Sequence, residues 1–285
     1  MPIEQPHSDS TYVIDSESAA ETARLLHQDR LITEYIGGLF PLEIDSSSIS
    51  QIVDLACGPG GWALAVAHAY PKIQVLGVDI SHTVVRYANA QAWAQGLNNA
   101  HFEVLDILKP LQFADASFDL VNARLLFGFM PTKAWPGLLR ECMRILRPGG
   151  PIFLNECEIG ITNSPASERL SEIFLRAIQR AGMVFSPDAR HVGITPMLGG
   201  LLREAGFRDI QQRAAVIDYS SGTSIHDAFC QDIMIGSKLA QPFMLKMGVT
   251  TQEELDRLYQ QCLDEIHAAD FRGVWYYLRA WGTKA

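Results

Sequence analysis

Hydrophobic residues follow two alternating patterns between residues 51 and 157. Short apolar runs, rich in Val, Ile and Leu, alternate with longer segments in which apolar residues recur at helical spacing. This alternation predicts a parallel sheet with helices on both of its faces. The expected strands are 51–56, 73–79, 101–106, 117–123 and 151–156, and the expected helices are 61–70, 82–96 and 132–147.

The pattern changes on both sides of this region. Before it, Ser18 and Glu21 are spaced as a capping box and precede apolar residues at helical spacing, which predicts a helix that ends near Gly37 and Gly38. After it, we expect helices at 167–182 and 195–205, an extended segment at 208–218, two or three amphipathic helices within 223–270 and a closing strand at 271–282.

These elements predict an α/β fold. Its sheet is doubly wound, mostly parallel and seven-stranded, with an N-terminal helical extension and an inserted helical cap. The expected boundaries are 1–48 for a loose arm and helical lid, 49–157 for the first part of the core, 158–194 for a helical insertion, 195–222 for the continuation of the core, 223–270 for a second insertion and 271–285 for the final strand.

Composition narrows the classes of partner. With 285 residues and 48% hydrophobic content, the chain buries a full core. A formal charge of −9, from 32 acidic and 23 basic residues, repels phosphate backbones and anionic lipid, so nucleic acid and membrane are not expected partners. The polar N-terminus and the lack of a long apolar run predict neither export nor a membrane span. The oligomeric state, including a homo-oligomer, is left open.

Cysteine usage points to a reducing compartment. The chain has five cysteines, an odd number, widely spread and without a CxxC pair. This pattern suggests neither a disulfide framework nor a zinc site, so we expect a cytoplasmic protein.

The segment IVDLACGPGGWA, residues 52–63, joins a predicted buried strand to a helix through a glycine turn. Glycines at positions 58 and 60 let the backbone turn sharply and lie close to a ligand. With Asp79 about twenty residues on, the turn satisfies the loose fingerprint of dinucleotide-binding proteins. By itself this is a weak signal, because another adenosine-bearing cofactor, S-adenosylmethionine, fits the same turn.

Acidic residues at the strand ends favour the second cofactor. Asp54 lies four residues before the first glycine, where the pyrophosphate of a dinucleotide would face a like charge. S-adenosylmethionine has no phosphate and carries an ammonium and a sulfonium. Asp54, Asp79 and Asp106 all end strands at one edge of the sheet, where ligands of open α/β sheets bind. Asp79 suits the ribose hydroxyls, Asp106 the adenine amino group and the Asp54 region the ammonium.

The chain resembles the class I S-adenosylmethionine-dependent methyltransferases. VDLACGPGGWA is similar to the glycine motif of the family, GVDIS to its ribose motif, EVLDIL to its adenine motif and ECMRILRPGG to the helix and turn before its fifth strand. The resemblance implies a Rossmann-like fold, S-adenosyl-L-methionine as cofactor and S-adenosyl-L-homocysteine as product. The cofactor-binding residues that it implies are Asp54, the Ala56 carbonyl, Gly58, Gly60, Asp79, Ile80, Asp106, Ile107 and Asn122.

Candidate catalytic residues are fewer. Glu156 follows the fifth strand and could serve as a general base or a counter-charge, and His191, before a helix, is a second candidate base. Carboxylates at strand exits are more often solvated or capping, and lone histidines such as His226 are usually structural. Arg124 could pair with a ligand carboxylate or with a neighbouring acid. Candidate substrate-binding residues are Tyr12, Phe127 and Phe129.

The two helical insertions favour a small or mid-sized, partly apolar acceptor, methylated on O, N or C. DLVNARLLFGF lacks the Asn/Asp-Pro-Pro-aromatic motif of enzymes that methylate base amines, so methylation of DNA is not expected. The sequence also lacks the acidic set with which related enzymes hold magnesium, so we expect no metal. Two alternatives stay open: a protein that binds S-adenosylmethionine or S-adenosylhomocysteine without transfer, and an NAD(P)-dependent oxidoreductase.

Overall fold

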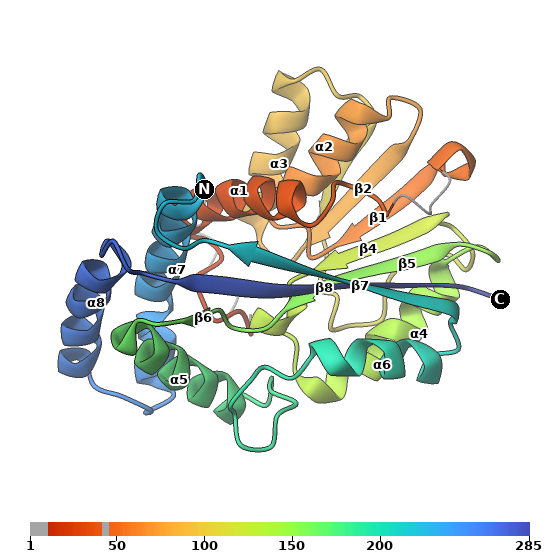
Figure 1. The fold of residues 1–285 in the computed structure, drawn as a ribbon. Helices are drawn as coiled ribbons and strands as arrows, with labels where there is room; N and C mark the ends of the chain where they lie inside the picture. Colours follow the sequence, from red (N-terminus) through yellow and green to blue (C-terminus); the bar gives the residue numbers. More distant parts are fainter. Residues whose placement is uncertain (1–10, 42–45) are drawn as a thin grey trace, which may run out of the picture.

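A computed structural model describes residues 11–41 and 46–285. Within these residues one sheet of eight strands runs through the protein, in the order β3-β2-β1-β4-β5-β8-β6, with β7 also pairing with β8 (Figure 1). Strands β1 to β5 are parallel neighbours, whereas β8 is antiparallel to β5, β6 and β7. The strands are β1 (Gln51–Leu55), β2 (Gln74–Asp79), β3 (Ala100–Val104), β4 (Leu120–Arg124), β5 (Pro151–Cys157), β6 (Ile161–Thr162), β7 (Arg208–Asp218) and β8 (Gly273–Thr283).

Helices cover both faces of the sheet, and each face has its own apolar core. Helices α1, α2 and α3 lie on one side in Figure 1, and α4 and α6 lie on the other. Successive residues of β1 point to opposite faces, so Ile52 joins one hydrophobic cluster and Val53 the other. The bounds of these helices are α1 (Ala19–Tyr35), α2 (Gly61–Ala69), α3 (His82–Ala94), α4 (Trp135–Ile145) and α6 (Leu198–Glu204).

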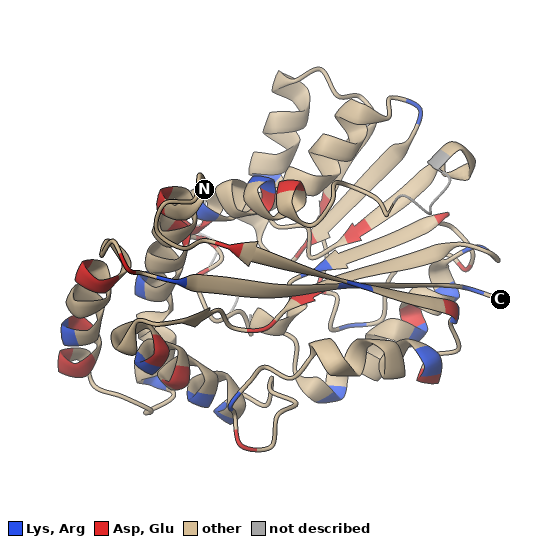
Figure 2. Ribbon diagram, viewed as in Figure 1, with Lys and Arg blue, Asp and Glu red and all other residues tan. Residues whose placement is uncertain are grey.

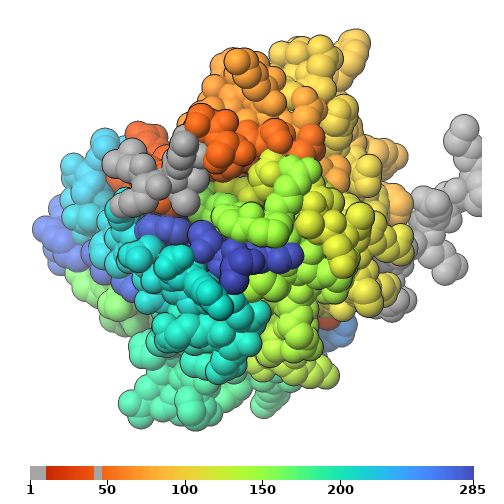
Figure 3. Space-filling view, turned by 90° about the vertical axis from the view of Figure 1, so that its right-hand side faces the viewer, coloured from red at the N-terminus to blue at the C-terminus, as the bar shows by residue number. Residues whose placement is uncertain are grey.

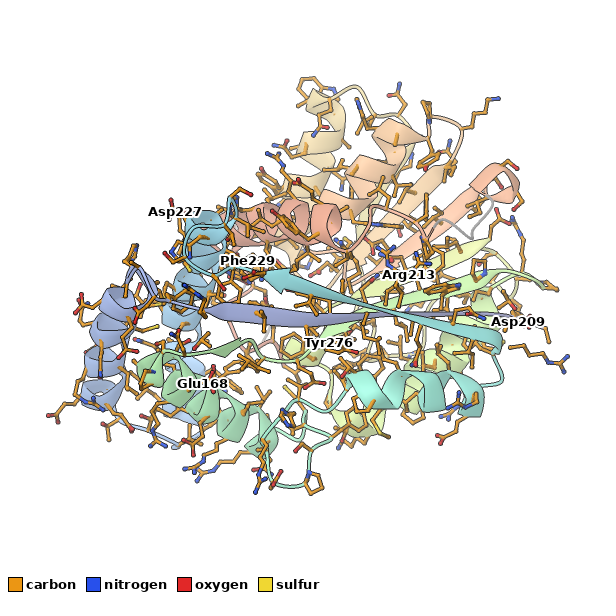
Figure 4. The ribbon with its side chains drawn as sticks, in the orientation of Figure 1. Glu168, Asp209, Arg213, Asp227, Phe229 and Tyr276 are labelled. Atoms are coloured by element: carbon orange, nitrogen blue, oxygen red, sulfur yellow. The ribbon has the colours of Figure 1, made fainter. Side chains whose placement is uncertain are left out.

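Three further helices form a cap beside the carboxyl ends of the parallel strands: α5 (Pro165–Arg180), α7 (His226–Lys246) and α8 (Gln252–Ile266) (Figure 1). Helix α7 packs against α1, α5 and α8. Phe229, labelled on α7 in Figure 4, meets Trp275 of β8 edge to face at 5.3 Å. The cap therefore rests on the long strand β8 as well as on the N-terminal helix.

The far end of the molecule is closed by the C-terminal strand. Figure 3 shows the last residues of the chain, in dark blue, at the surface beside the teal segment that contains β7. Register pairs such as Arg208 with Thr283 account for this contact. Acidic and basic segments alternate along α5 and α8 (Figure 2). In the residues that the structure describes, no helix is long and apolar enough to cross a membrane.

Most of the predicted elements are confirmed, with three differences. The sheet has an eighth strand, β6, because Ile161 and Thr162 pair with the start of β8. The predicted helix 132–147 begins as the 3-10 turn η3 (Thr132–Ala134), and its α-helical part starts at Trp135, just before Pro136, which suits a first turn. The predicted helix 195–205 likewise begins as a 3-10 turn, η4 (Thr195–Met197). The segment 223–270 forms two helices, within the two or three expected. Residues 1–10 of the expected loose arm lie outside the described residues.

Candidate functional site

The glycine turn between β1 and α2 has the conformation that its sequence requires. Gly58 has φ 54° and Gly60 has φ 83°, both in the left-handed region that glycine tolerates. A side chain at position 60 would also lie 2.6 Å from the ring of Phe102. Ala56 has φ 54° as well, which is uncommon for a residue with a Cβ. The chain is thus held in a tight loop at the end of β1.

Asp79 fastens this loop to the next strand. Its carboxylate accepts hydrogen bonds from the backbone N–H of Gly58 at 2.9 Å and of Ser81 at 3.0 Å. Burial raises the pKa of Asp79, although these hydrogen bonds act in the opposite direction. A carboxylate has about four acceptor positions, so Asp79 retains capacity for ligand hydroxyls.

Asp54 is buried at the base of the site. It is 3% exposed and accepts a hydrogen bond from the Asn122 side-chain amide at 2.7 Å. Burial raises the pKa of Asp54 from 3.8 to about 7, and the charge of Asp79 acts in the same direction. From the sequence, Asp54 was expected to carry a fixed negative charge. In the fold, burial leaves its carboxyl group partly protonated near neutral pH.

The third acid lies at the rim. Asp106 accepts the backbone N–H of Leu108 at 2.9 Å and pairs with Lys109 at 3.2 Å. The neighbouring side chain of Ile107 is buried. Asp106 is therefore held in place with its carboxylate half-buried.

These residues border one cavity of about 330 Å³ that extends from the glycine turn into the cap. One end contains the turn, Asp79, Ile80 and Asp106. The other end lies among α1, α5, α7 and β8 and is mainly apolar. Its walls include Ile159, Leu170, Phe174, Ile233, Met234, Met244, Trp275 and Tyr277. The cavity can therefore hold a polar, adenosine-sized ligand beside an apolar one.

A buried group of charged and polar side chains lies beside the cavity. Glu21 and Arg24 form a paired contact, with Arg24 Nε and Nη2 donating to the two Glu21 oxygens at 2.7 Å each. Arg24 Nη1 donates to Asp232 of α7 at 3.2 Å, and the Tyr12 hydroxyl donates to Glu21 at 2.7 Å. Glu21 is 1% and Asp232 2% exposed. We call these four side chains the Arg24 cluster.

Most of the predicted binding residues border this cavity. The structure brings together Tyr12, Asp54, Ala56, Gly58, Asp79, Ile80, Asp106, Ile107, Phe127 and Phe129. Gly60 and Asn122 lie behind the wall: Gly60 packs against Phe102, and the Asn122 amide is bound to Asp54. Arg124 lines the cavity and pairs with Asp29 of α1.

Neither of the two candidate catalytic residues, Glu156 and His191, lines the cavity. Glu156 is 0% exposed and accepts the backbone N–H of Leu126 and Phe127, because in β5 it faces away from the cavity. His191 is exposed on a loop away from the cavity lining. His226, the other histidine considered, contacts the Tyr219 carbonyl through Nδ1 at 2.9 Å. The geometry therefore gives neither Glu156 nor His191 contact with a ligand in this cavity.

Apart from Tyr12, sequence reasoning missed the members of the Arg24 cluster as site residues, and it missed Asp29. Glu21, Arg24 and Gln28 lie at helical spacing and form a polar stripe along one face of α1. Helix α7 of the cap covers this face, and Gln28 donates to Asp232 there. That stripe was the available signal, but its partner Asp232 is 208 residues away in the chain. Across residues 11–41 and 46–285, no group of three or more His, Cys, Asp or Glu could hold a metal.

Comparison with known proteins shows what the first part of the core is similar to. A Rossmann-like sheet with a glycine turn at its switch point defines a nucleotide-type cofactor fold. Residues 52–150 match the family described as "Methyltransferase domain". Over these residues the chain is similar to a methyltransferase domain.

Relatives and solved structures agree with this class. The probable methyltransferase ltbC of Aspergillus luteorubrus is 31% identical over 162 residues, 55% of this chain and 56% of that protein. The 27-O-demethylrifamycin SV methyltransferase of Amycolatopsis mediterranei is 31% identical over 159 residues, 54% of this chain and 55% of that protein. The chain thus spans little more than half the length of these curated relatives.

Solved structures share the fold. Phosphoethanolamine N-methyltransferase 2 of Haemonchus contortus, in complex with S-adenosyl-L-methionine, has a TM-score of 0.54 at 17% identity and covers 94% of this chain and 57% of that chain. A putative methyltransferase of Haloferax volcanii, in complex with the Trm112 methyltransferase activator, has a TM-score of 0.57 at 17% identity and covers 95% of this chain and 98% of that chain.

Proposed function

We propose that the protein transfers a methyl group from S-adenosyl-L-methionine to a small, partly apolar acceptor. The observation that carries this proposal is the single cavity that joins the glycine turn and its acids to an apolar chamber under the cap. S-adenosyl-L-methionine, when bound, supplies an electrophilic methyl group on a sulfonium. The protein then has to align the acceptor with this group and exclude water.

The residues of the turn fit the adenosine half of the cofactor. Gly58 and Gly60 keep the wall free of side chains, so that a ligand can approach the backbone closely. We assign Asp79 to the ribose hydroxyls and Asp106 to the adenine amino group. Ile80 and Ile107 would contact the adenine ring.

The methionine half carries an ammonium and a carboxylate, and two oppositely charged residues are suitably placed for it. Arg124, at the end of β4, and Asp29 of α1 contact each other and line the cavity, and Asp29 lies against Gly61 of the glycine turn. We assign the carboxylate to Arg124 and the ammonium to Asp29, with the Ala56 carbonyl and the buried Asp54 nearby. Asn122 then acts indirectly, by holding Asp54.

The acceptor would lie between the cofactor and the cap. Phe127 and Phe129 follow β4, and Tyr12 of the N-terminal segment packs edge to face on Phe129 with ring centres 6.3 Å apart. The backbone N–H of Val13 donates to the Gly128 carbonyl at 3.2 Å, which ties the N-terminal segment to this loop. An acceptor enclosed by these side chains is separated from bulk water.

Calorimetry and product analysis test the proposal. We expect the protein to bind S-adenosyl-L-methionine and S-adenosyl-L-homocysteine but not NADH, and to release S-adenosyl-L-homocysteine with a panel of apolar alcohols, amines and thiols. Binding of the cofactor without transfer to any acceptor would support the alternative of a binding protein. Binding of NADH in preference to both adenosyl compounds would support an oxidoreductase and refute the proposal.

A further inference from the structure

The Arg24 cluster is unusual because it buries three charges beside an apolar chamber. Two carboxyl groups, of Glu21 and Asp232, share the single guanidinium of Arg24, so acidic groups outnumber basic ones in the cluster. A buried carboxylate is costly unless it is paired, and a cationic ligand in the neighbouring cavity lowers that cost. A sulfonium cofactor in the same cavity is such a ligand.

The cluster reaches the cavity through Tyr12. The Tyr12 ring lines the cavity and lies against the loop after β4, where a Cβ on Gly128 would be 3.4 Å from its Cε2 atom. Its hydroxyl donates to Glu21 Oε1 at 2.7 Å, and a phenol oxygen that donates its proton can still accept hydrogen bonds. Tyr12 thus provides a hydrogen-bonded route from the cavity to a buried carboxylate.

We propose, on the basis of the function proposed above, that the acceptor is a neutral, largely apolar molecule with a hydroxyl group, and that Tyr12 passes the hydroxyl proton to Glu21 during methyl transfer. Arg24 and Asp232 act as positioning residues, since they hold Glu21 through the bonds described above.

Atoms and charges balance in this step. The acceptor oxygen bonds to the methyl carbon while the bond between that carbon and sulfur breaks, and its electron pair stays on sulfur. The acceptor proton moves to the Tyr12 oxygen, and the Tyr12 proton moves to Glu21 Oε1. The positive charge of the sulfonium and the negative charge of Glu21 are lost together, so that no new charge is left in the apolar chamber.

The surroundings of Tyr12 support a relay over a stable phenolate. Burial and the neighbouring Glu21 raise the pKa of Tyr12 well above its usual range. Tyr12 therefore stays protonated and transmits a proton without holding a negative charge. The acidic groups of the cluster disfavour a carboxylate or phosphate on the acceptor. Of the two cationic side chains that line the cavity in the described residues, Arg24 is held by Glu21 and Asp232, and Arg124 is the residue assigned above to the cofactor carboxylate.

Two probes separate a proton-accepting role from a structural one. 2-Naphthol must lose a proton as it is methylated, whereas 2-naphthalenethiol is largely ionised in solution and needs no proton acceptor. We expect Tyr12→Phe and Glu21→Gln to lower kcat for 2-naphthol by about 100-fold, the usual scale of general base catalysis, and to leave kcat for the thiol unchanged. Glu172→Gln, at a half-exposed ion pair on α5, is the control and should leave both rates unchanged.

A binding measurement gives a readout independent of turnover. The quantity compared is the ratio of the affinity for 2-naphthol to the affinity for 2-methoxynaphthalene, each measured in the complex with S-adenosyl-L-homocysteine. This ratio should be about fivefold larger for wild-type protein than for Tyr12→Phe, which is the effect of one hydrogen bond. Tyr12→Phe keeps the Arg24 ion pairs, so it remains informative if Glu21→Gln fails to fold.

Each outcome bears on a different claim. Equal losses for 2-naphthol and the thiol in the variants would overturn the relay and leave the cluster a structural role. Wild-type protein that methylates the thiol but neither 2-naphthol nor other aryl alcohols would overturn the hydroxyl assignment and leave the proposed function intact. Absence of S-adenosyl-L-methionine binding would refute the proposed function itself.

Discussion

The buried carboxylate of Glu156 accepts a hydrogen bond from the backbone N–H of Leu126 at 2.8 Å. A second bond, from the Phe127 N–H at 3.3 Å, fixes the turn that follows β4. This turn begins at Leu125, whose φ of 56° lies in the left-handed region. Phe127 projects from it to line the cavity, so Glu156 shapes the acceptor end without contacting a ligand.

Glu156→Gln should change how stability depends on pH. Burial raises the pKa of Glu156 from 4.5 to about 8 in the folded protein. Its contribution to stability is therefore fully present below the unfolded pKa and is lost as pH rises towards about 8. The free energy of unfolding of wild-type protein should fall with pH across this window more steeply than that of Glu156→Gln, by at most about 1.4 kcal/mol per pH unit. Urea unfolding at a series of pH values measures both slopes, and parallel slopes would contradict this prediction.

Asp54→Asn should remove a pH dependence of cofactor binding. The pKa of Asp54 is about 7 in the free protein because the group is buried. A cationic ligand favours the charged form, so affinity for S-adenosyl-L-methionine should rise as pH increases through about 7, with release of a proton on binding. Calorimetry in buffers of different ionisation enthalpy measures that proton. Asn at position 54 can still accept the bond from Asn122, and this variant should bind more weakly, without the proton release. Identical proton release by both proteins would place the titrating group elsewhere.

Asp79→Ala should weaken binding of S-adenosyl-L-homocysteine by about 1–3 kcal/mol, because the ribose hydroxyls would lose a buried partner. The change also releases the Gly58 N–H, which Asp79 accepts at 2.9 Å. Isothermal calorimetry measures the loss, and Asp188→Asn, on an exposed loop, is the control that should bind like wild type. Unchanged affinity in Asp79→Ala would show that the ribose lies elsewhere.

Gly60→Ala should destabilise the protein. Its φ of 83° is unfavourable for alanine, and the new Cβ would lie 2.6 Å from the Phe102 ring and 3.1 Å from Ala88. Strain and overpacking of this kind cost about 1–3 kcal/mol each. Gly200→Ala in α6 is the matched control, because no atom lies within 4 Å of its new Cβ, and alanine favours a helix by up to about 1 kcal/mol. Thermal unfolding should show a lower midpoint for the first variant and an equal or higher one for the second.

Local sequence was enough to predict the cofactor end of the site. The apolar run of β1, the glycines of the turn and the helix that follows are consecutive, and each conformation depends on nearby residues. Asp79 ends β2 and Asp106 follows the end of β3 in one parallel sheet, so chain order alone brings them to the same edge. Glu21, three residues after Ser18, shows where local sequence was not enough to predict a contact. The Ser18 side chain caps α1 as predicted, but Glu21 bonds Arg24 and Tyr12, outside the capping box.

The direction of a side chain in a fully buried strand was beyond sequence reasoning. All residues of β5 are buried, so no alternation of polar and apolar residues shows which face Glu156 takes. The pairing of Asp232 with Arg24 was equally hidden, since only the packing of α7 on α1 joins two segments so distant in the chain.

The sequence by itself determined the succession of strands and helices in the core, the glycine turn and the acids at its rim, because neighbouring residues and chain connectivity decide these features. Tertiary structure alone decided which carboxylates line the cavity, which are sealed behind it, and how far burial shifts their pKa. Those properties depend on desolvation and on charges brought together from distant segments, and such effects exist only once the chain is packed.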